Sequence, residues 1–237
     1  MKKLGIIAAP GWFDPSLDEF MAWHGDVLQA TQTILPAPGF DYSFDAIRHS
    51  RPALEQATGL LVEAGAEVIA QVGPAFAYLV GGSANGAREL QQQLSEHCGV
   101  PVVLNGVAIL DALEACGAKK IAAACPYYAP DWKLMLTEFL EAEGYIIDAF
   151  QTFVEQGIFP DQETVAARAY HFSDEEVIGS VRRTREAAPN ADCLLISGSG
   201  IRTPHWRAQL EDSLKFPVIA ADRALYLSTA QRLGLIE

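Results

Sequence analysis

The feature that most constrains this chain is an internal repeat. Three blocks of the first half recur in the same order in the second half: residues 2–10 resemble 119–126, residues 65–73 resemble 190–198, and residues 99–108 resemble 215–224. Chains rich in apolar strands repeat short runs by chance, but the shared order of three separate blocks favours duplication. We therefore predict two similar lobes, one formed by residues 1–117 with 217–237 and the other by residues 118–216.

Apolar runs alternate with amphipathic stretches along both halves, and this alternation predicts an α/β fold with parallel sheets. The expected strands are 4–9, 33–35, 67–72, 101–104, 120–125, 145–150, 193–196 and 217–220. The expected helices are 50–65, 84–98, 107–116, 131–144, 173–188, 204–214 and 222–233. Ser173, followed three residues later by Glu176, predicts a capping box at the start of one of them. Residues 17–30 fit either a helix or a capping loop.

In parallel α/β sheets, ligands bind at the carboxyl ends of the strands. Two related lobes that face each other would place such strand ends along a cleft between them. Four turns of this chain are expected to line that cleft: Pro10-Gly11-Trp12, Gly73-Pro74-Ala75, Pro126-Tyr127-Tyr128 and Ser197-Gly198-Ser199-Gly200.

Composition and charge exclude several classes of function. The 237 residues carry a formal net charge of −13, which argues against nucleic acid and anionic membrane surfaces as partners. The apolar run near the N-terminus is too short for a signal peptide and is expected to be a strand. The cysteines show no CxxC or zinc-finger spacing, so we expect reduced thiols in a cytoplasmic protein. They are Cys98, Cys116, Cys125 and Cys193.

The stretch from Leu194 to Thr203 passes from an apolar strand into Ser-Gly-Ser-Gly. Such a turn exposes backbone N–H groups that hold a carboxylate or an oxyanion, especially where a helix follows. An ordinary tight turn explains the same residues equally well. Ser197 and Ser199 could donate hydrogen bonds to a ligand, although a serine in a turn more often bonds its own backbone.

Few other side chains could take part in chemistry. Tyr127 could donate to an oxyanion, or could act only as an aromatic lid. Cys125 is the one thiol near a strand end on the expected cleft side, where a buried structural cysteine is the commoner role. Arg202 could bind a carboxylate or form a surface ion pair. His171 and His205 are possible acids or bases with no partner spacing to support them. No spacing of His, Asp or Glu indicates a metal site.

Several of these segments resemble the aspartate/glutamate racemase superfamily, in the branch that holds arylmalonate decarboxylase and maleate cis–trans isomerase. The matching pieces are Val72-Gly73-Pro74 with Gly81-Gly82, residues 101–120, Pro126-Tyr127, Ser197 through Arg202-Thr203, and residues 217–234. The resemblance implies two pseudo-symmetric Rossmann-like lobes and chemistry at a carbon beside a carboxylate. It also implies that neither a metal nor an organic cofactor is needed.

The resemblance also implies a catalytic cysteine after the third strand of each lobe, or of the second lobe alone in the decarboxylases. Those positions fall at Gly73 and Gly198. A glycine cannot move a proton or attack carbon, which disfavours racemisation by two thiols and isomerisation through a thiol adduct. Decarboxylation suffers least, because an apolar pocket and hydrogen-bond donors can still stabilise an enediolate. The proton would then come from water, Tyr127 or Cys125.

The sequence therefore predicts a cofactor-independent enzyme that acts on a small carboxylate, with a decarboxylase or other lyase favoured over an isomerase. The expected catalytic residues are Tyr127, Ser199 and Cys125. The expected substrate-binding residues are Pro10, Trp12, Gly73, Pro74, Ala75, Ser197 and Gly198, with Tyr42 as a further wall residue. A catalytically silent carboxylate-binding protein of the same fold is the alternative. The protein is expected to be a monomer or a homo-oligomer.

Overall fold

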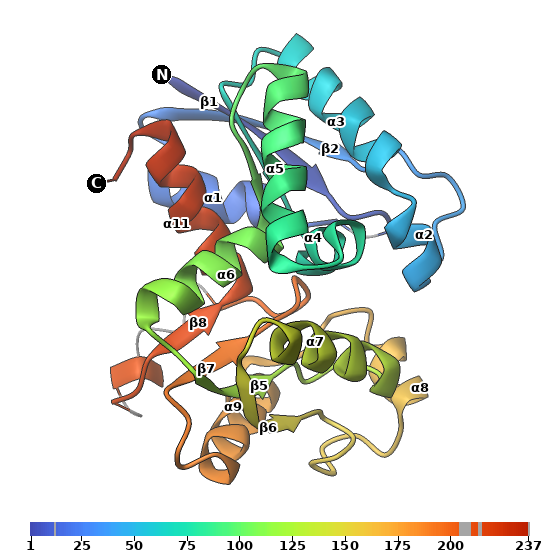
Figure 1. The fold of residues 1–237 in the computed structure, drawn as a ribbon, viewed down its shortest axis with the longest axis vertical. Helices are drawn as coiled ribbons and strands as arrows, with labels where there is room; N and C mark the ends of the chain where they lie inside the picture. The colour runs from blue at the N-terminus through green and yellow to red at the C-terminus, as the bar shows by residue number, and fades with distance from the viewer. Residues whose placement is uncertain (12, 204–209, 213–214, 237) are drawn as a thin grey trace. The chain divides into compact units, whose positions relative to one another are not determined.

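The computed structural model describes residues 1–11, 13–203, 210–212 and 215–236. The chain divides into two compact units, the first formed by Met1–Leu110 with Asp222–Glu237 and the second by Asp111–Ala221. Each unit is built around one parallel sheet of four strands with helices on its faces (Figure 1). The predicted α/β class with two lobes is confirmed.

The sheet of the first unit contains β1 (Lys2–Ala8), β2 (Leu28–Ile34), β3 (Val68–Gln71) and β4 (Val102–Leu104), in the order β2-β1-β3-β4. β1, β3 and β4 are short apolar runs with buried central residues, as expected for a parallel sheet covered by helices. β2 is the edge strand, and Leu28 is its one buried residue. β2 is longer than the strand predicted over 33–35, and β1 pairs with its whole length.

The helices of the first unit are α1 (Ser16–His24), α2 (Phe44–Arg48), α3 (Arg51–Glu63), α4 (Pro74–Gly81), α5 (Ala84–Cys98), the first part of α6 (Asn105–Cys116), and α11 (Ala221–Leu233). The bounds of α5 are those predicted, because Ser83 caps its first turn and Gly99 ends it in the left-handed conformation. α4 and α2 were not predicted. α4 is a short apolar run with two aromatic residues, it ends in Gly81, and Gly73 and Gly82 flank it, which weakens the helical pattern in the sequence.

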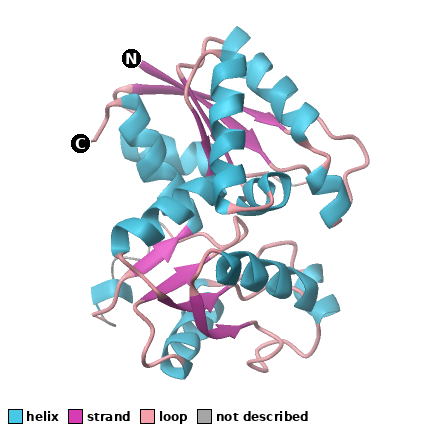
Figure 2. Cartoon of the chain, in the orientation of Figure 1, coloured by secondary structure: helices cyan, strands magenta, loops and turns pink. Residues whose placement is uncertain are grey.

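The sheet of the second unit contains β5 (Lys120–Ala124), β6 (Ile146–Gln151), β7 (Cys193–Ile196) and β8 (Val218–Ala220), in the order β6-β5-β7-β8. Its helices include the second part of α6, α7 (Pro130–Ala142), α8 (Gln162–Ala167) and α9 (Asp174–Ala187), drawn in cyan around the magenta strands in Figure 2. The predicted capping box at Ser173 and Glu176 is present at the start of α9. The predicted helix over 204–214 falls largely on residues outside the described ranges.

The two sheets have the same strand order, in which the second strand of the unit comes first, then the first, third and fourth. The three repeated blocks of sequence correspond to β1 and β5, β3 and β7, and β4 and β8. Gly73 and Gly198 also match: both follow the third strand and both have positive φ, at +104° and +98°. The repeat therefore describes a shared topology and not only a shared composition.

The division between the units differs from the predicted one at residues 111–117 and 217–221, which were assigned to the first lobe. β8 pairs in parallel with β7, from Leu194 opposite Val218 to Ile196 opposite Ala220, and so completes the second sheet. Only the helix that follows returns to the first unit, where Tyr226 of α11 packs edge-on against Phe20 and donates a 2.6 Å hydrogen bond to Glu19. Strand pairing, which local sequence does not reveal, decides where the boundary lies.

Among the helices that the structure describes, none has the length and apolar character needed to cross a membrane.

Candidate functional site

The carboxyl ends of β5 and β7 lie side by side in the second unit. These strands are parallel neighbours whose register pairs Ala124 with Ile196, so Cys125 and Ser197 leave the sheet next to each other. Cys125 is fully buried, and burial raises the pKa of its thiol to about 12 even though the backbone and hydroxyl of Ser197 act to lower it. The thiol is therefore protonated and sealed at neutral pH.

Ser197 is as buried as its neighbour. Its hydroxyl finds no oxygen or nitrogen partner within the described part of the chain. The hydroxyl of Ser197 is therefore a fully buried polar group at the end of β7, where it acts on the Cys125 thiol.

Gly198 follows Ser197 in a conformation that only glycine adopts readily, with φ at +98°. The space that a β-carbon on this residue would fill is already taken by the hydroxyl of Tyr127, with Cζ of Tyr127 at 2.8 Å and Cε1 of Tyr128 at 3.0 Å from that position. Glycine is required here by backbone conformation and by space. The predicted residues Tyr127 and Gly198 are therefore in direct contact.

Tyr127 is held from several directions. Its hydroxyl oxygen accepts a 3.3 Å hydrogen bond from the backbone N–H of Gly200, and its carbonyl accepts one of 3.0 Å from Nε2 of Gln162. Its ring stacks on Phe172 at 6.1 Å and meets the ring of Tyr170 edge-on at 5.3 Å. Burial is the main cause that raises the pKa of the Tyr127 phenol well above its ordinary value, so the phenol is neutral across the physiological range.

Tyr170 was missed in the sequence, where nothing distinguishes it from other aromatic residues after a short helix. Ala169 and Tyr170 both have positive φ, at +46° and +68°, which costs on the order of 1–3 kcal/mol for each non-glycine residue. This strained pair turns the Tyr170 ring over Gly200, where a β-carbon would lie 3.1 Å from Cγ and Cε1 of the ring. Strain of this kind persists only where surrounding contacts determine the conformation.

Of the remaining candidate residues of the second unit, Ser199 and Arg202 lie at this turn. Ser199 is half-buried, and its carbonyl accepts a 3.1 Å hydrogen bond from Nη1 of Arg202. His171 is exposed and contributes its carbonyl to Arg168, with no place in the cluster. His205 lies outside the described residues.

In the first unit, the equivalent turn follows β3. The backbone N–H of Gly73 donates a 3.3 Å hydrogen bond to Oδ1 of Asn105, and Nε2 of Gln71 donates to the carbonyl of Gly73 at 3.2 Å. Pro74 and Ala75 are buried in the first turn of α4, where backbone N–H groups point away from the helix and can hold an anion. Asn105 and Gln71 were not predicted, although both are polar residues at the ends of strands.

The space beside Gly73 differs from that beside Gly198. A β-carbon on Gly73 would lie 3.2 Å from Cδ2 of Phe76, which is tight but leaves no backbone in the way. Phe76 in turn stacks on Phe40 at 6.0 Å, and Phe40 packs edge-on against Tyr42. Tyr42 donates a short hydrogen bond to the carbonyl of Pro10, which brings these two predicted wall residues together. Trp12 lies outside the described residues.

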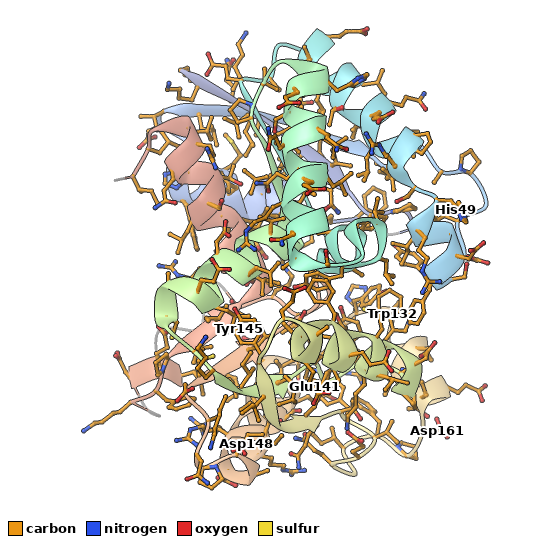
Figure 3. All side chains as sticks on the ribbon, viewed as in Figure 1. His49, Trp132, Glu141, Tyr145, Asp148 and Asp161 are labelled. Atoms are coloured by element: carbon orange, nitrogen blue, oxygen red, sulfur yellow. The ribbon has the colours of Figure 1, made fainter. Side chains whose placement is uncertain are left out.

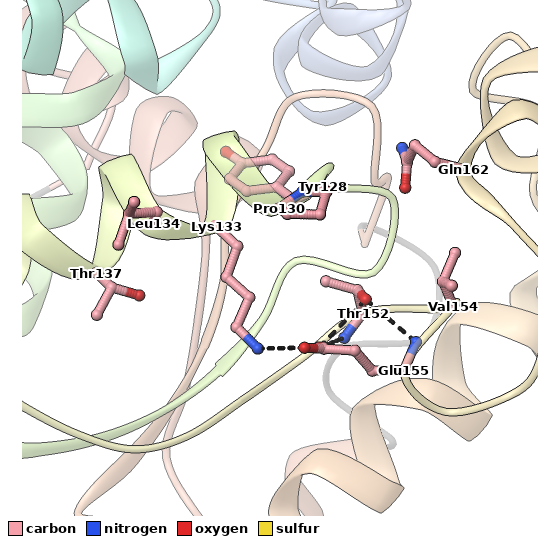
Figure 4. Close-up of a pocket in the computed structure, with 9 residues that line it drawn as sticks. All are labelled: Tyr128, Pro130, Lys133, Leu134, Thr137, Thr152, Val154, Glu155 and Gln162. Carbon is pink, nitrogen blue, oxygen red and sulfur yellow. Dashed lines mark hydrogen bonds and ion pairs between the residues drawn. The ribbon is translucent and has the colours of Figure 1, made fainter.

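A cavity of about 490 Å³ lies in the second unit between α7 and the segment after β6 (Figure 4). Its lining is mainly apolar and consists of Tyr128, Pro130, Lys133, Leu134, Thr137, Thr152, Val154, Glu155 and Gln162. Tyr128 and Gln162 connect the cavity to the site, because both contact Tyr127. Lys133 and Glu155 form a 2.6 Å ion pair along one side. Figure 3 shows Trp132 where α7 begins, and its ring packs against Tyr128 at 5.8 Å.

Within the described ranges, His, Cys, Asp and Glu side chains do not gather in groups of three that could hold a metal ion.

A model of the arylmalonate decarboxylase family matches residues 39–236, which is most of the chain. The chain belongs to the arylmalonate decarboxylase family. Arylmalonate decarboxylase from Bordetella bronchiseptica is 25% identical over 174 residues, covering 73% of this chain and 68% of that protein. The family assignment confirms the resemblance found in the sequence.

Solved structures similar to this family member share its fold. A crystal structure of arylmalonate decarboxylase has a TM-score of 0.76 at 20% identity and covers 99% of this chain and 94% of its own. Maleate isomerase Iso from Pseudomonas putida S16 has a TM-score of 0.78 at 15% identity, covering 98% and 93%. Maleate cis-trans isomerase from Nocardia farcinica has a TM-score of 0.69 at 17% identity, covering 99% and 93%. The relatives are thus decarboxylases and isomerases.

Proposed function

We propose that this protein is a cofactor-independent enzyme that acts on a small carboxylate and stabilises an enolate-like intermediate. The observation that carries the proposal is the convergence of the Tyr127 hydroxyl with the turn from Ser197 to Gly200 at the carboxyl ends of β5 and β7. Membership of the arylmalonate decarboxylase family supports an enzyme, and the names of its relatives specify arylmalonates and maleate, which both carry two carboxylates.

The proposed reaction needs groups that hold negative charge where it develops. Loss of CO2 from a carbon beside a second carboxylate leaves an electron pair on that carbon, and the pair spreads onto oxygen as an enediolate. Hydrogen-bond donors placed in advance stabilise such charge by several kcal/mol. In the second unit we assign this role to the hydroxyls of Tyr127, Ser197 and Ser199 and to the backbone of Gly198.

The turn after β3 supplies a further proposed carboxylate-holding group. The backbone N–H of Ala75 lies in the first turn of α4, while Gly73 and Pro74 shape the approach to it. Pro10 and Tyr42 are proposed wall residues of the same unit. Each group assigned a role here belongs to the protein chain itself.

A lyase is favoured over an isomerase that forms a thiol adduct. Such an adduct needs an accessible thiolate. Cys125 is fully buried with a pKa raised to about 12, and neither Gly73 nor Gly198 carries a thiol. The apolar cavity beside Tyr128 supports a substrate with a bulky apolar or aromatic part next to its carboxylates.

The experiment offers the purified protein phenylmalonate and, separately, maleate, and follows products by NMR and release of CO2. Phenylacetate with CO2 is the expected product, whereas fumarate from maleate would favour an isomerase. A shift in melting temperature with dicarboxylates but no turnover would indicate the catalytically silent binding protein. If the protein shows no turnover and no shift in melting temperature with any mono- or dicarboxylate, the carboxylate proposal as a whole is contradicted.

A further inference from the structure

We propose that the phenol of Tyr127 is the acid that delivers a proton to the intermediate, from the space that a side chain on residue 198 would otherwise fill. This assignment rests on the proposed function and selects one donor among water, Cys125 and Tyr127. It makes Tyr127 a catalytic residue, with Gly200 and Tyr170 as positioning residues.

The first support is the use of space at the end of β7. A β-carbon on Gly198 would clash with the Tyr127 hydroxyl and would lie 2.8 Å from Cζ of the same ring. Real β-carbons essentially never come within 3.0 Å of a non-bonded heavy atom. The polar group presented beside the third strand of this sheet therefore comes from the turn after β5 and not from β7 itself.

The second support is the way in which the hydroxyl is fixed. The backbone N–H of Gly200 donates to its oxygen at 3.3 Å, so the phenol uses a lone pair for the protein and keeps its own proton for donation. The ring is clamped by Phe172 on its face and by Tyr170 at its edge. Tyr170 reaches that place through the strained pair Ala169–Tyr170. A donor held this firmly pays little reorganisation cost at the moment of transfer.

The other candidate groups fit the role of proton donor less well. Cys125 is fully buried beside Ser197, on the interior side of the turn. Arg202 is engaged with the carbonyl of Ser199, and a guanidinium does not give up a proton in this pH range. His171 is exposed and has no contact with the turn among the described residues.

The bond between the α-carbon and the departing carboxylate breaks and CO2 leaves. The electron pair of that bond stays on the α-carbon and spreads over the remaining carboxylate as the enediolate. The O–H bond of Tyr127 then breaks as a C–H bond forms at that carbon. The resulting phenolate is stabilised by the Gly200 N–H until water returns a proton to it, so one proton from solvent is consumed for each CO2 released.

The test uses a prochiral arylmalonate with an α-methyl group, because its product is chiral. Tyr127→Phe removes the donor and keeps the ring. We expect it to lower kcat by about 100- to 10,000-fold, and we expect the residual product to be racemic because water protonates both faces. Tyr145→Phe is the matched control: Tyr145 directly precedes β6, at the amino end of that strand, whereas the site follows the carboxyl ends of β5 and β7. It should keep both rate and enantiomeric excess.

A residue that only holds the carboxylate would give a different result. Residual product from Tyr127→Phe with unchanged enantiomeric excess would overturn the assignment while the proposed function stands. Activity of Tyr127→Phe within twofold of the parent would do the same. A parent protein without turnover on any carboxylate would overturn the proposed function, and the assignment with it.

A second pair of variants keeps the assignment testable if Tyr127→Phe folds poorly. Gly198→Cys alone should be inactive and less stable, because its side chain collides with Tyr127. Tyr127→Ala combined with Gly198→Cys clears the space and places an acidic thiol in it, so part of the activity should return with high enantiomeric excess. A double variant no more active than Tyr127→Ala, although folded by circular dichroism, would overturn the assignment.

Discussion

The backbone N–H of Gly200 donates a 3.3 Å hydrogen bond to the hydroxyl oxygen of Tyr127, and 73 residues of sequence separate the two. β5 and β7 are parallel neighbours, so the turns that follow them meet at one edge of the sheet. The hydrogen bond ties those turns together. The phenol is thereby fixed beside Gly198, and the properties of each turn depend on the other.

The two glycines after the third strands should respond differently to alanine. Both have positive φ, which costs about 1–3 kcal/mol for a non-glycine residue. Gly198→Ala also collides with Tyr127, which adds roughly 1–3 kcal/mol of overpacking, whereas Gly73→Ala meets only the edge of Phe76. Urea denaturation should therefore show a larger loss of unfolding free energy for Gly198→Ala. Equal losses would mean that the phenol moves aside freely.

Cysteine labelling should separate accessible from sealed thiols. With a pKa of about 12, Cys125 is a thiolate in about one molecule in ten thousand at pH 8, and it is fully buried. Iodoacetamide should modify the exposed Cys116 first and leave Cys125 intact in the native protein. Peptide mass spectrometry after timed labelling gives the measurement, with urea-unfolded protein as the control. Rapid, substrate-protected labelling of Cys125 would point to this thiol as the acid instead.

The strain before the Tyr170 ring can be relieved at one position. Ala169 has φ at +46°, and a left-handed residue other than glycine costs roughly 1–2 kcal/mol. Ala169→Gly removes that strain, but a glycine loses more backbone entropy on folding, which costs about 0.5–1 kcal/mol. The strain relieved is the larger of the two, so we expect a small rise in melting temperature. Ala166→Gly, inside α8, is the matched control and should lower it. A lower melting temperature for both variants would show that Ala169 is not strained.

Asp192 links the start of β5 to the segment before β7. Its Oδ2 accepts hydrogen bonds from the backbone N–H groups of Lys119 and Lys120, at 2.8 and 2.7 Å. These bonds, that of Lys120 first, lower the pKa of the carboxyl below its ordinary value of 3.8. A lowered pKa adds stability that is fully present above pH 3.8 and is lost as pH falls through the folded-state pKa.

Asp192→Asn should therefore lower the melting temperature at pH 7. The difference in melting temperature between this variant and the parent should become smaller below pH 3.8. Thermal melts followed by circular dichroism across this range test the sign. A gap that stays constant with pH would mean that the charge of Asp192 does not contribute.

The cavity beside Tyr128 should govern the size of the apolar group that a substrate carries. Leu134 lines it from α7 and is exposed, so Leu134→Arg should change the unfolding free energy by less than about 0.5 kcal/mol. The long charged side chain would fill the opening and raise KM for an aryl substrate more than for a methyl-substituted malonate. Leu227→Arg, on an exposed position of α11, is the control. An equal increase in KM for both substrates would argue against a role of the cavity in substrate choice.

Much of the fold could be read from local pattern. The strands and the capped helices α5 and α9 follow from buried runs, Ser N-caps and terminal glycines, which act within a few residues. α4 was missed because its aromatic residues and the glycines at and beyond its ends blur the helical pattern. Residues 217–220 were assigned to the other lobe because strand pairing is not local. Of the candidate site, the turns at Gly73, Tyr127 and Ser197–Gly200 were predicted and their binding role stays a prediction, whereas Tyr170, Asn105 and Gln71 were not predicted.

The sequence by itself determined the duplicated α/β topology, the strand ends at which a ligand is expected, and the family, because each is encoded in periodicity and in the order of short motifs. Tertiary structure alone decided how those ends are filled. It placed the Tyr127 hydroxyl in the space beside Gly198, sealed Cys125 against Ser197 and turned Tyr170 over Gly200. The reason is physical: these are packing contacts between residues far apart in the chain, and packing depends on which strands become neighbours.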